Sequence, residues 1–383
     1  MPVASDRVAV WSATEAPASG LSAQLIAWQR QHGRHALPWQ GTRDPYRVWL
    51  SEIMLQQTQV TTVLGYYERF LQHFPDVAAL AAAPQDAVLA QWAGLGYYSR
   101  ARNLHRCAQD VVGRFDGAFP SDPADLESLP GIGRSTAAAI AAFCFGRRTA
   151  ICDGNVRRVL SRVLGFDEDL AQAAAQRRLW DIAEALLPAQ DIEAYTQGLM
   201  DLGATLCTPR RPDCERCPWR DTCVARAQQR QADYPRRSRR LQRGRRDIVW
   251  LWLQEADGAV WLCQRPQTGI WAGLWCLPEC EDLAQARAVG AALGVRPQVL
   301  APFKHVLTHQ DLWLQPVLLR LSPEVDVQAV ERHLRGLGPQ EPVPAACRRV
   351  LPHQRAAHGL PAPLQRLLES PPQPAPADLF SLG

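Results

Sequence analysis

Residues 121–136 have the sequence SDPADLESLPGIGRST, which combines two helix signals with a glycine turn. Asp122-Pro123 places an aspartate at a helix N-cap and a proline at the first helical position, so a short helix is expected to end near Leu129. The turn at residues 130–133 follows, and an alanine-rich helix is expected over residues 134–145. The sequence therefore predicts a helix, a glycine hairpin and a second helix.

The glycines of this hairpin have a physical use. Gly131 and Gly133 lack side chains, so nearby backbone N–H groups can approach a phosphate, and the next helix offers its positive N-terminal end. An ordinary turn between helices is the alternative. The segment CDGNV, residues 152–156, then places Asp153 at another helix N-cap. Capping alone is the simpler interpretation, but a cap beside a phosphate-binding hairpin would also face the backbone and sugar of DNA.

A second carboxylate lies in the helical part of the chain, which extends over residues 21–225. Asp44-Pro45 is again a helix start, and the helix that follows is largely apolar. Glu52 lies among these apolar residues, where loss of hydration is expected to raise its pKa and keep a proton available. The alternative is an exposed helix carboxylate.

Four cysteines in a C-x6-C-x2-C-x5-C spacing indicate a metal ligand set: Cys207, Cys214, Cys217 and Cys223. Structural zinc also takes four cysteines, but zinc sites usually pair two short knuckles, and only one short knuckle is present here. Unliganded thiols are a further alternative. One knuckle with two longer arms favours a 4Fe-4S cluster held by four thiolates.

Composition limits the function classes. The chain has 383 residues, of which 47% are hydrophobic and 21% charged, as in a multidomain protein with real cores. No apolar run is long enough to span a membrane, and the N-terminus has no export signal. The 11 cysteines are therefore expected in a reducing compartment, without a disulfide framework. A net charge of +4 is too small to indicate nucleic acid by itself.

The composition changes after the cysteines. Residues 226–246 hold nine arginines and few apolar residues, which indicates a basic linker, either a solvated tether or a phosphate-binding segment. Strands are expected at 248–253 and 259–263 around the turn Asp257-Gly258, with a helix near 282–293 and further strands over 302–321. We therefore predict the following organisation: a flexible tail (1–20), a mostly α domain with its cysteine loop (21–225, loop 207–223), the linker (226–246), an α+β domain (247–368) and a disordered tail (369–383).

The order of hairpin, Gly/Pro-rich loop and aspartate resembles the helix–hairpin–helix DNA glycosylase superfamily. The cysteines resemble its iron–sulfur branch, which contains endonuclease III and the adenine DNA glycosylases. In the endonuclease III pattern a lysine follows the Gly-Arg of the hairpin and attacks the sugar as an amine. Here Ser135 takes that place, and a hydroxyl cannot form a Schiff base. The resemblance therefore implies hydrolysis without an efficient strand-cleaving lyase step.

Four segments resemble the adenine DNA glycosylase (MutY-type) family: LPW (37–39), DPY (44–46), WLSEIMLQQTQV (49–60) and GLGYYSRARNL (94–104). The resemblance covers residues 21–225 closely and 247–365 more loosely. It implies base excision repair of adenine mispaired with 8-oxoguanine or guanine in duplex DNA. An endonuclease III-like glycosylase/lyase and a non-catalytic binder of damaged DNA are the alternatives.

The resemblance also implies roles for the carboxylates. Glycoside hydrolysis uses an acid and a second carboxylate that stabilises a cationic sugar. Glu52 would protonate the adenine ring and then help to activate water. Asp153, at a helix N-terminus, would stay ionised and stabilise the sugar cation, and Asn155 would orient Asp153 or the water.

The same resemblance gives candidate DNA and base contacts. The target base must be flipped out of the duplex. Gln56 and Tyr97 match positions that probe or wedge into the base stack, and Leu37 and Trp39 match the wall of the adenine pocket, with core packing as the alternative for each.

Further candidate contacts lie on the hairpin and the cysteine loop. Gly131, Gly133 and Ser135 would face the DNA backbone. Arg210 and Arg211, between the first two cysteines, would contact phosphates, with a solvated loop as the alternative.

The C-terminal domain resembles a Nudix-like module through GIWAGLWCLP at 269–278. The glutamate array that holds magnesium is missing from residues 281–295, so recognition is expected instead of diphosphate hydrolysis. In the family a Phe-Ser-His loop reads 8-oxoguanine. Here the loop is KHVLTH, residues 304–309, in which Thr308 keeps a hydroxyl, Leu307 loses the aromatic face, and His309 is retained.

The last expectations concern the C-terminal peptide, the oligomeric state and the location of the protein. Asp378-Leu379-Phe380 loosely resembles a sliding-clamp-binding peptide. We expect a monomer that acts on double-stranded DNA in the cytoplasm, associated with the bacterial nucleoid, and that does not bind membranes.

Overall fold

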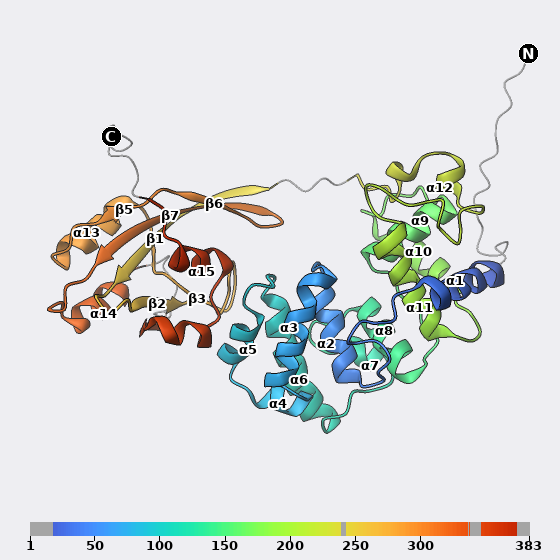
Figure 1. Ribbon diagram of the computed structural model, residues 1–383, viewed down its shortest axis with the longest axis horizontal. Coiled ribbons are helices and arrows are strands. Elements are labelled where there is room, and N and C mark those ends of the chain that lie inside the picture. The colour runs from blue at the N-terminus through green and yellow to red at the C-terminus, as the bar shows by residue number, and fades with distance from the viewer. Residues whose placement is uncertain (1–17, 239–242, 336, 338–345, 374–383) are drawn as a thin grey trace, which may run out of the picture. The chain divides into compact units, whose positions relative to one another are not determined.

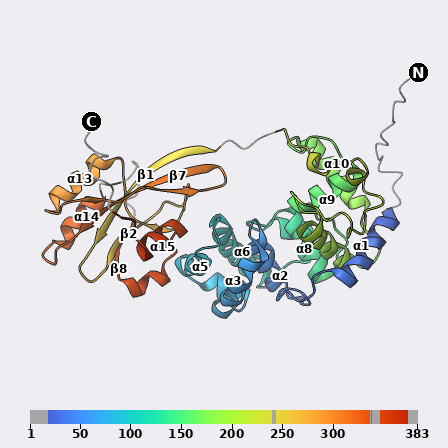
Figure 2. The same cartoon turned by 45° about the horizontal axis from the view of Figure 1, so that its top comes forward.

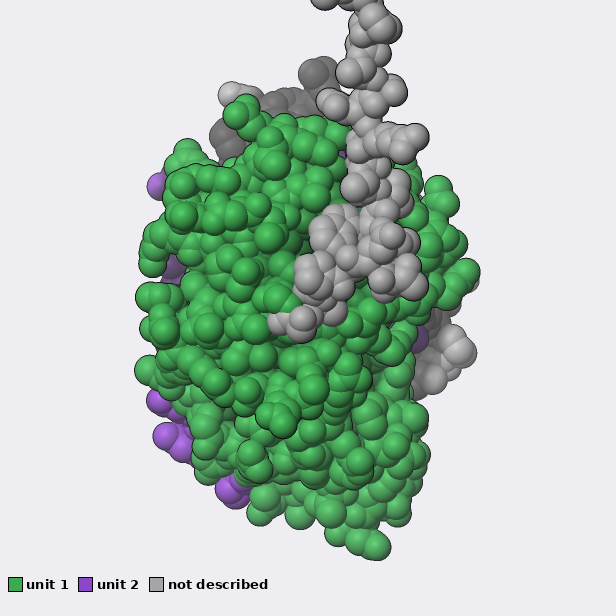
Figure 3. All heavy atoms as spheres, turned by 90° about the vertical axis from the view of Figure 1, so that its right-hand side faces the viewer, with its two compact units in different colours: residues 1–67, 76–78, 106–240 green, residues 68–75, 79–105, 241–383 purple. Residues whose placement is uncertain are grey.

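The computed structural model describes residues 18–238, 243–335, 337 and 346–373 (Figure 1). The chain folds into two compact units, coloured separately in Figure 3. Unit 1 comprises residues 1–67, 76–78 and 106–240, and unit 2 comprises residues 68–75, 79–105 and 241–383. Helices α3 (Val60–His73) and α6 (Ser99–Phe115) each have residues in both units.

Unit 1 is helical throughout its described residues. Besides its parts of α3 and α6, its α-helices are α1 (Ala18–His32), α2 (Pro45–Leu55), α7 (Pro123–Glu127), α8 (Arg134–Phe145), α9 (Gly154–Leu164), α10 (Ala173–Ala185), α11 (Ile192–Asp201) and α12 (Val224–Ala227). A π-helix, Leu202–Leu206, continues α11, and a 3₁₀ helix spans Gln231–Asp233.

The predicted helix–hairpin–helix is confirmed. Asp122 caps α7, with its side chain accepting a hydrogen bond from the Ala124 N–H at 2.8 Å. The turn after α7 places Gly131 at a φ of 80°, a left-handed conformation that favours glycine. The next helix, α8, begins at Arg134 and buries its alanine run, residues 137–142.

Helix α2 shows how the sequence places a carboxylate. Asp44 caps the helix by accepting the Tyr46 N–H at 2.9 Å, as the Asp-Pro signal predicts. One side of α2 buries Trp49, Ile53 and Met54 completely or nearly so. Glu52 lies on the same helix but lines a cavity.

Helix α9 lies in the hydrophobic core of unit 1. Its apolar residues pack with buried residues of α1, α8, α10 and α11 in one continuous cluster. The N-terminus of α9 carries Asp153, and the side chains of its later turns reach the cysteine loop. A single helix therefore positions both features that the sequence singles out.

Unit 2 contains a mixed sheet of eight described strands (Figures 1 and 2). The strands are β1 (Gly244–Gln254), β2 (Val260–Gln264), β3 (Trp275–Cys276), β4 (Glu279–Cys280), β5 (Gln298–Val299), β6 (Phe303–Val306), β7 (Gln310–Arg320) and β8 (Cys347–Val350). The main path runs in the order β3-β2-β1-β7-β5, while β4 pairs with β1, β6 with β7 and β8 with β2. Only the long β1–β7 pair, with Ile248 opposite Leu314, is parallel among the described pairs.

Besides its parts of α3 and α6, unit 2 contains most of α4 (Val77–Ala82), α5 (Gln85–Trp92), α13 (Leu283–Ala292), α14 (Val327–Arg335), a 3₁₀ helix at Pro352–Ala357 and α15 (Ala362–Glu369). Buried residues of α13 and α14 form one cluster with apolar residues of β1 and β7. The predicted strands and the helix near 282–293 are confirmed, and with them the mostly α and α+β fold class.

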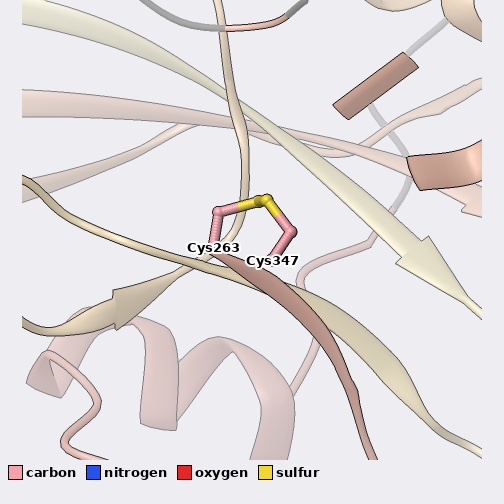
Figure 4. Close-up of a disulfide and its surroundings, with 2 residues drawn as sticks. All are labelled: Cys263 and Cys347. Atoms are coloured by element: carbon pink, nitrogen blue, oxygen red, sulfur yellow. A yellow bond between two sulfur atoms is a disulfide. The ribbon is translucent and has the colours of Figure 1, made fainter. Parts of the chain in front are cut away.

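One expectation from composition is wrong. Cys263 on β2 and Cys347 on β8 form a disulfide (Figure 4). The two residues are directly opposite in the antiparallel ladder, with their Cα atoms 4.0 Å apart, so both side chains point to the same face. A count of cysteines cannot reveal this pairing, because it depends on the register of strands separated by 84 residues.

Most of the predicted linker has defined partners. The Leu170 N–H donates to the Arg236 carbonyl at 3.0 Å, and the Ser238 N–H donates to Asp169 at 3.1 Å. The segment up to Ser238 is therefore bonded to unit 1, and β1 begins at Gly244. Residues 239–242, both predicted tails up to residue 17 and from residue 374, and Asp378-Leu379-Phe380 lie outside the described residues. None of the described helices is long and apolar enough to cross a bilayer.

Candidate active site and cysteine loop

A cavity of about 960 Å³ opens in unit 1 among α2, α8, α11, the start of α9 and the segment before α2. It brings together seven of the residues predicted from sequence. They are Leu37, Trp39, Glu52, Gln56, Ser135, Asp153 and Asn155. These residues come from four separate stretches of chain, so the cavity depends on the packing of unit 1 as a whole.

The two carboxylates of the cavity differ in environment. Glu52 is half-buried and lines the cavity. Burial is the main cause, and the charge of Asp153 the second, of a rise in the pKa of Glu52 to about 8. The expected rise is confirmed, and Glu52 holds a proton at neutral pH.

Asp153 is exposed and caps α9. Its Oδ1 accepts the N–H groups of Asn155 at 2.9 Å and Val156 at 2.8 Å. Among the described residues no hydrogen bond to Oδ2 is formed, and Asp153 is part of the cavity lining. The carboxylate therefore satisfies two of the backbone donors that a helix N-terminus leaves without partners.

Two neighbours fix the position of this carboxylate. The Ser135 hydroxyl accepts the Cys152 N–H at 3.1 Å, which ties the start of α8 to the residue before Asp153. Asn155 accepts a hydrogen bond from Arg158 at 3.0 Å through its Oδ1. A Cβ atom on Gly203 would lie 2.9 Å from the Asn155 Cβ, so the π-helix closely approaches this side of the cavity.

The remaining predicted cavity residues form its rim and wall. Gln56 ends α2 and donates to the Thr136 hydroxyl at 3.5 Å. Trp39 is buried and packs edge-on against Tyr67, with ring centroids 5.3 Å apart. The Leu37 N–H donates to Gln40 at 3.1 Å, which closes the turn that carries both wall residues. Trp39 therefore contributes to the core as well as to the cavity.

Four polar residues that the sequence did not single out also line the cavity: Arg34, His35, Gln40 and Gln197. Arg34 and Gln197 both bind the buried Asp201. Arg34 donates to Asp201 Oδ1 at 2.7 Å, and Gln197 donates to the same oxygen at 2.9 Å. Arg34 and Gln40 could have been found from the sequence, because they flank the motif Leu37-Pro38-Trp39. Gln197 could not, because only the tertiary fold brings α11 to the cavity.

The hairpin glycines lie outside the cavity lining. Both Gly131 and Gly133 are exposed, and a Cβ atom on Gly133 would meet nothing within 4 Å. The open space in front of α8 leaves room for a ligand to approach the backbone, as the sequence predicted.

The four predicted ligand cysteines are neighbours on the loop after the π-helix. Burial raises the pKa of Cys217, and charge on Cys207, Cys214 and Cys223 acts on it in the same direction, as expected of thiols that are close neighbours. Within the described residues, no three His, Cys, Asp or Glu are grouped as ligands of a single metal ion.

Two buried arginines of α9 hold this loop. Arg158 donates to the carbonyl oxygens of Cys207 and Gly203, both at 2.8 Å. Arg162 donates to the Thr208 carbonyl at 2.7 Å and to the Cys207 sulfur at 3.4 Å. The predicted phosphate contacts Arg210 and Arg211 are exposed on the same loop.

The other predicted contacts lie in unit 2. Tyr97 is exposed at a φ of 48°, a strained conformation for a side chain of this size. Arg100 stabilises this turn by stacking on the Tyr97 ring, 5.6 Å from its centroid, and by donating to the Gly96 carbonyl at 3.2 Å. The Tyr97 hydroxyl contacts the Thr308 hydroxyl, and His309 is exposed beside it in sequence.

The arrangement in unit 1 can perform acid-assisted hydrolysis. It places two carboxyl groups, Glu52 with a raised pKa and the helix-capping Asp153, at one cavity, and cleavage of a glycosidic bond commonly uses such a pair.

Comparison with known protein families agrees with this chemistry. Residues 50–185 match the HhH-GPD superfamily of base excision DNA repair proteins. Residues 207–223 match the iron–sulfur binding domain of endonuclease III, and residues 249–370 match the NUDIX domain. The cysteine loop is therefore an iron–sulfur binding site.

Individual relatives identify the branch. The chain is 34% identical to the adenine DNA glycosylase of Buchnera aphidicola subsp. Baizongia pistaciae, over 78% of this chain and 85% of that protein. It is 33% identical to the human adenine DNA glycosylase, over 83% of this chain and 70% of that protein. Among solved structures, a thermostable thymine-DNA glycosylase matches 55% of this chain and 97% of its own, with a TM-score of 0.50 and 27% identity. The chain belongs to the adenine DNA glycosylase family of base excision repair enzymes, which hydrolyse N-glycosyl bonds.

Proposed function

We propose that this glycosylase removes adenine mispaired with 8-oxoguanine or guanine from double-stranded DNA by simple hydrolysis. The observation that carries the proposal is the pairing of Glu52, whose pKa is raised to about 8, with the helix-capping carboxylate of Asp153 at one cavity. A proton donor and an anion at one site suit a leaving group that must be protonated and a sugar that becomes cationic.

The chemical step follows from these two groups. Glu52 transfers its proton to the adenine ring, and the bond between the sugar and the base breaks with its electron pair leaving on adenine. Asp153 stabilises the cationic sugar through its carboxylate. Water then adds to the sugar and returns a proton to Glu52, while Asn155, held by Arg158, orients Asp153 or the water.

The wall and rim of the cavity serve base binding. Leu37 and Trp39 contact the flipped adenine, and Gln56 and Tyr97 enter the base stack. Gly131, Gly133 and Ser135 on the hairpin, together with Arg210 and Arg211, hold the DNA backbone. The exposure of Tyr97, Gly131, Gly133, Arg210 and Arg211 supports their part in this assignment.

Reading of 8-oxoguanine is assigned to the loop at residues 304–309. The Thr308 hydroxyl lies against Tyr97, and His309 is exposed on the same loop. This placement supports a role for Thr308 and His309 in recognising the base opposite adenine.

The cluster is proposed to be 4Fe-4S, with Cys207, Cys214, Cys217 and Cys223 as its ligands. When bound, it supplies a rigid cross-link among the four thiolates. The buried arginines of α9 already orient the backbone of this loop, and the cluster would therefore fix Arg210 and Arg211 toward phosphate.

The wider organisation is part of the same proposal. A helical glycosylase domain (21–225), a linker (226–246) and a Nudix-like recognition domain (247–368) lie between a tail at 1–20 and a tail at 369–383. We also propose that the protein acts as a monomer in the cytoplasm, associated with the nucleoid. The tail peptide Asp378-Leu379-Phe380 is a candidate sliding-clamp contact on its sequence alone.

Substitution of the acid tests the mechanism. Glu52→Gln keeps the size of the side chain but cannot donate the proton, so single-turnover adenine release from an A:8-oxoguanine duplex should fall at least about 100-fold. Glu168→Gln, a carboxylate outside the cavity lining, is the matched control and should retain wild-type release. Equal release by Glu52→Gln and wild type would refute the assignment of the acid.

The absence of a lyase step is tested by borohydride trapping. The wild-type protein should release adenine without forming a covalent protein–DNA complex, because the Ser135 hydroxyl cannot form the Schiff base that borohydride reduces. An enzyme of the endonuclease III type is the positive control. Efficient trapping of this protein would support the glycosylase/lyase alternative.

Iron analysis tests the cofactor. Wild-type protein purified without oxygen should contain about four irons per chain, and Cys217→Ala should lose most of them. Cys144→Ala, at a cysteine outside the quartet, should keep them. Stoichiometric zinc in place of iron would contradict the proposed cluster and would leave the assignment of the carboxylates unchanged.

A further inference from the structure

Asp86 on α5 joins two strands of the C-terminal sheet within unit 2. Its Oδ1 accepts a hydrogen bond from Gln264 at 3.1 Å, and its Oδ2 accepts one from the Trp275 indole N–H at 3.2 Å. Gln264 and Trp275 are directly opposite each other on β2 and β3, so their donors reach the carboxylate from one place on the sheet. Trp275 is almost completely buried.

Close apolar packing surrounds this carboxylate. Leu89, one turn further along α5, is buried, and a Cβ atom on Gly359 would lie 2.8 Å from the Leu89 Cβ. A Cβ atom on Gly273 would lie 3.6 Å from Leu89. The helix and two turns of the C-terminal part therefore approach each other so closely that glycine is required at Gly359.

Two further hydrogen bonds join the segment that follows α5 to the same turns. The Tyr98 hydroxyl donates to the Leu360 carbonyl at 3.1 Å, and Arg102 donates to the Ala272 carbonyl at 2.7 Å. Tyr98 follows Tyr97 directly in sequence, and Tyr97 contacts Thr308. Tyr97, the candidate wedge residue, therefore belongs to the segment after α5 that is bonded to the C-terminal turns. The candidate reading loop, residues 304–309, belongs to the C-terminal part that carries those turns.

We propose that Asp86 is a positioning residue that fastens the C-terminal sheet to α5 and thereby sets the position of the loop 304–309 against Tyr97. The role in lesion reading rests on the proposed function of that loop, whereas the fastening does not. Hydrogen bonds to a carboxylate are stronger than hydrogen bonds to a neutral acceptor. Removal of the Asp86 carboxylate would leave the buried Trp275 N–H without a partner. Asp86 touches none of the reacting groups assigned above, so it can change discrimination without removing the chemistry.

The fastening is tested in the full chain with a protease site placed at residues 239–242. After cleavage, the two pieces of the otherwise wild-type protein should elute together from a size-exclusion column. In Asp86→Ala they should separate, with a dissociation constant raised at least about fivefold, because a buried donor is left unpaired. Asp110→Ala, an exposed helix carboxylate paired with Arg114, is the matched control and should behave as wild type. Separation of the wild-type pieces, or unchanged association in Asp86→Ala, would overturn the fastening.

Discrimination is measured on the uncleaved variants. The ratio of single-turnover adenine release from A:8-oxoguanine over A:G should fall at least about fivefold in Asp86→Ala, while release from A:G stays within about twofold of wild type. Trp275→Phe, which keeps a large ring and removes the N–H donor, should lower the ratio in the same direction. An unchanged ratio in a variant whose cleaved pieces separate would overturn the role in reading. Lack of release from every duplex by wild type would instead refute the proposed function, and the elution result would still decide the fastening.

Discussion

Two guanidinium groups buried on one helix constrain the structure of unit 1. Arg158 and Arg162 are among its least exposed charged residues, and a buried cation is tolerated only when its N–H groups find acceptors. Those acceptors are backbone oxygens of the π-helix, of the loop that starts at Cys207 and of Gln231. Helix α9 can therefore occupy its place in the core only with the cysteine loop folded against it.

The same helix sets the chemistry at its other end. Its first N–H groups hold Asp153 through one oxygen, while α2 carries Glu52 into a desolvated position nearby. Two carboxyl groups at one cavity thus lie in different environments, Glu52 with its pKa raised by burial and Asp153 at an exposed helix N-terminus. The difference arises from backbone capping in one case and from burial in the other. Both groups are ordinary side-chain carboxylic acids, and their surroundings make them different.

Local signals in the sequence were sufficient for much of this structure. Asp-Pro pairs predicted the starts of α2 and α7, and the glycine hairpin between α7 and α8 followed from adjacent residues. The partners of Asp201, the contacts of Asp86 and the disulfide of Cys263 could not be predicted in this way. Each depends on the approach of elements far apart in the chain, which local propensity does not encode. The candidate carboxylates were found because their own neighbours, an apolar helix and an N-cap, reveal their environment.

The central claim is that burial keeps a proton on Glu52 for transfer to adenine, and the pH dependence of the chemical step tests it most directly. Because the pKa of Glu52 is raised to about 8, its protonated form predominates at neutral pH and is lost as the pH rises through that value. Single-turnover adenine release should therefore be maximal below about pH 7 and fall about tenfold per pH unit above the pKa. A rate that stays constant to about pH 9, or one already lost between about pH 4 and 5, would contradict the account.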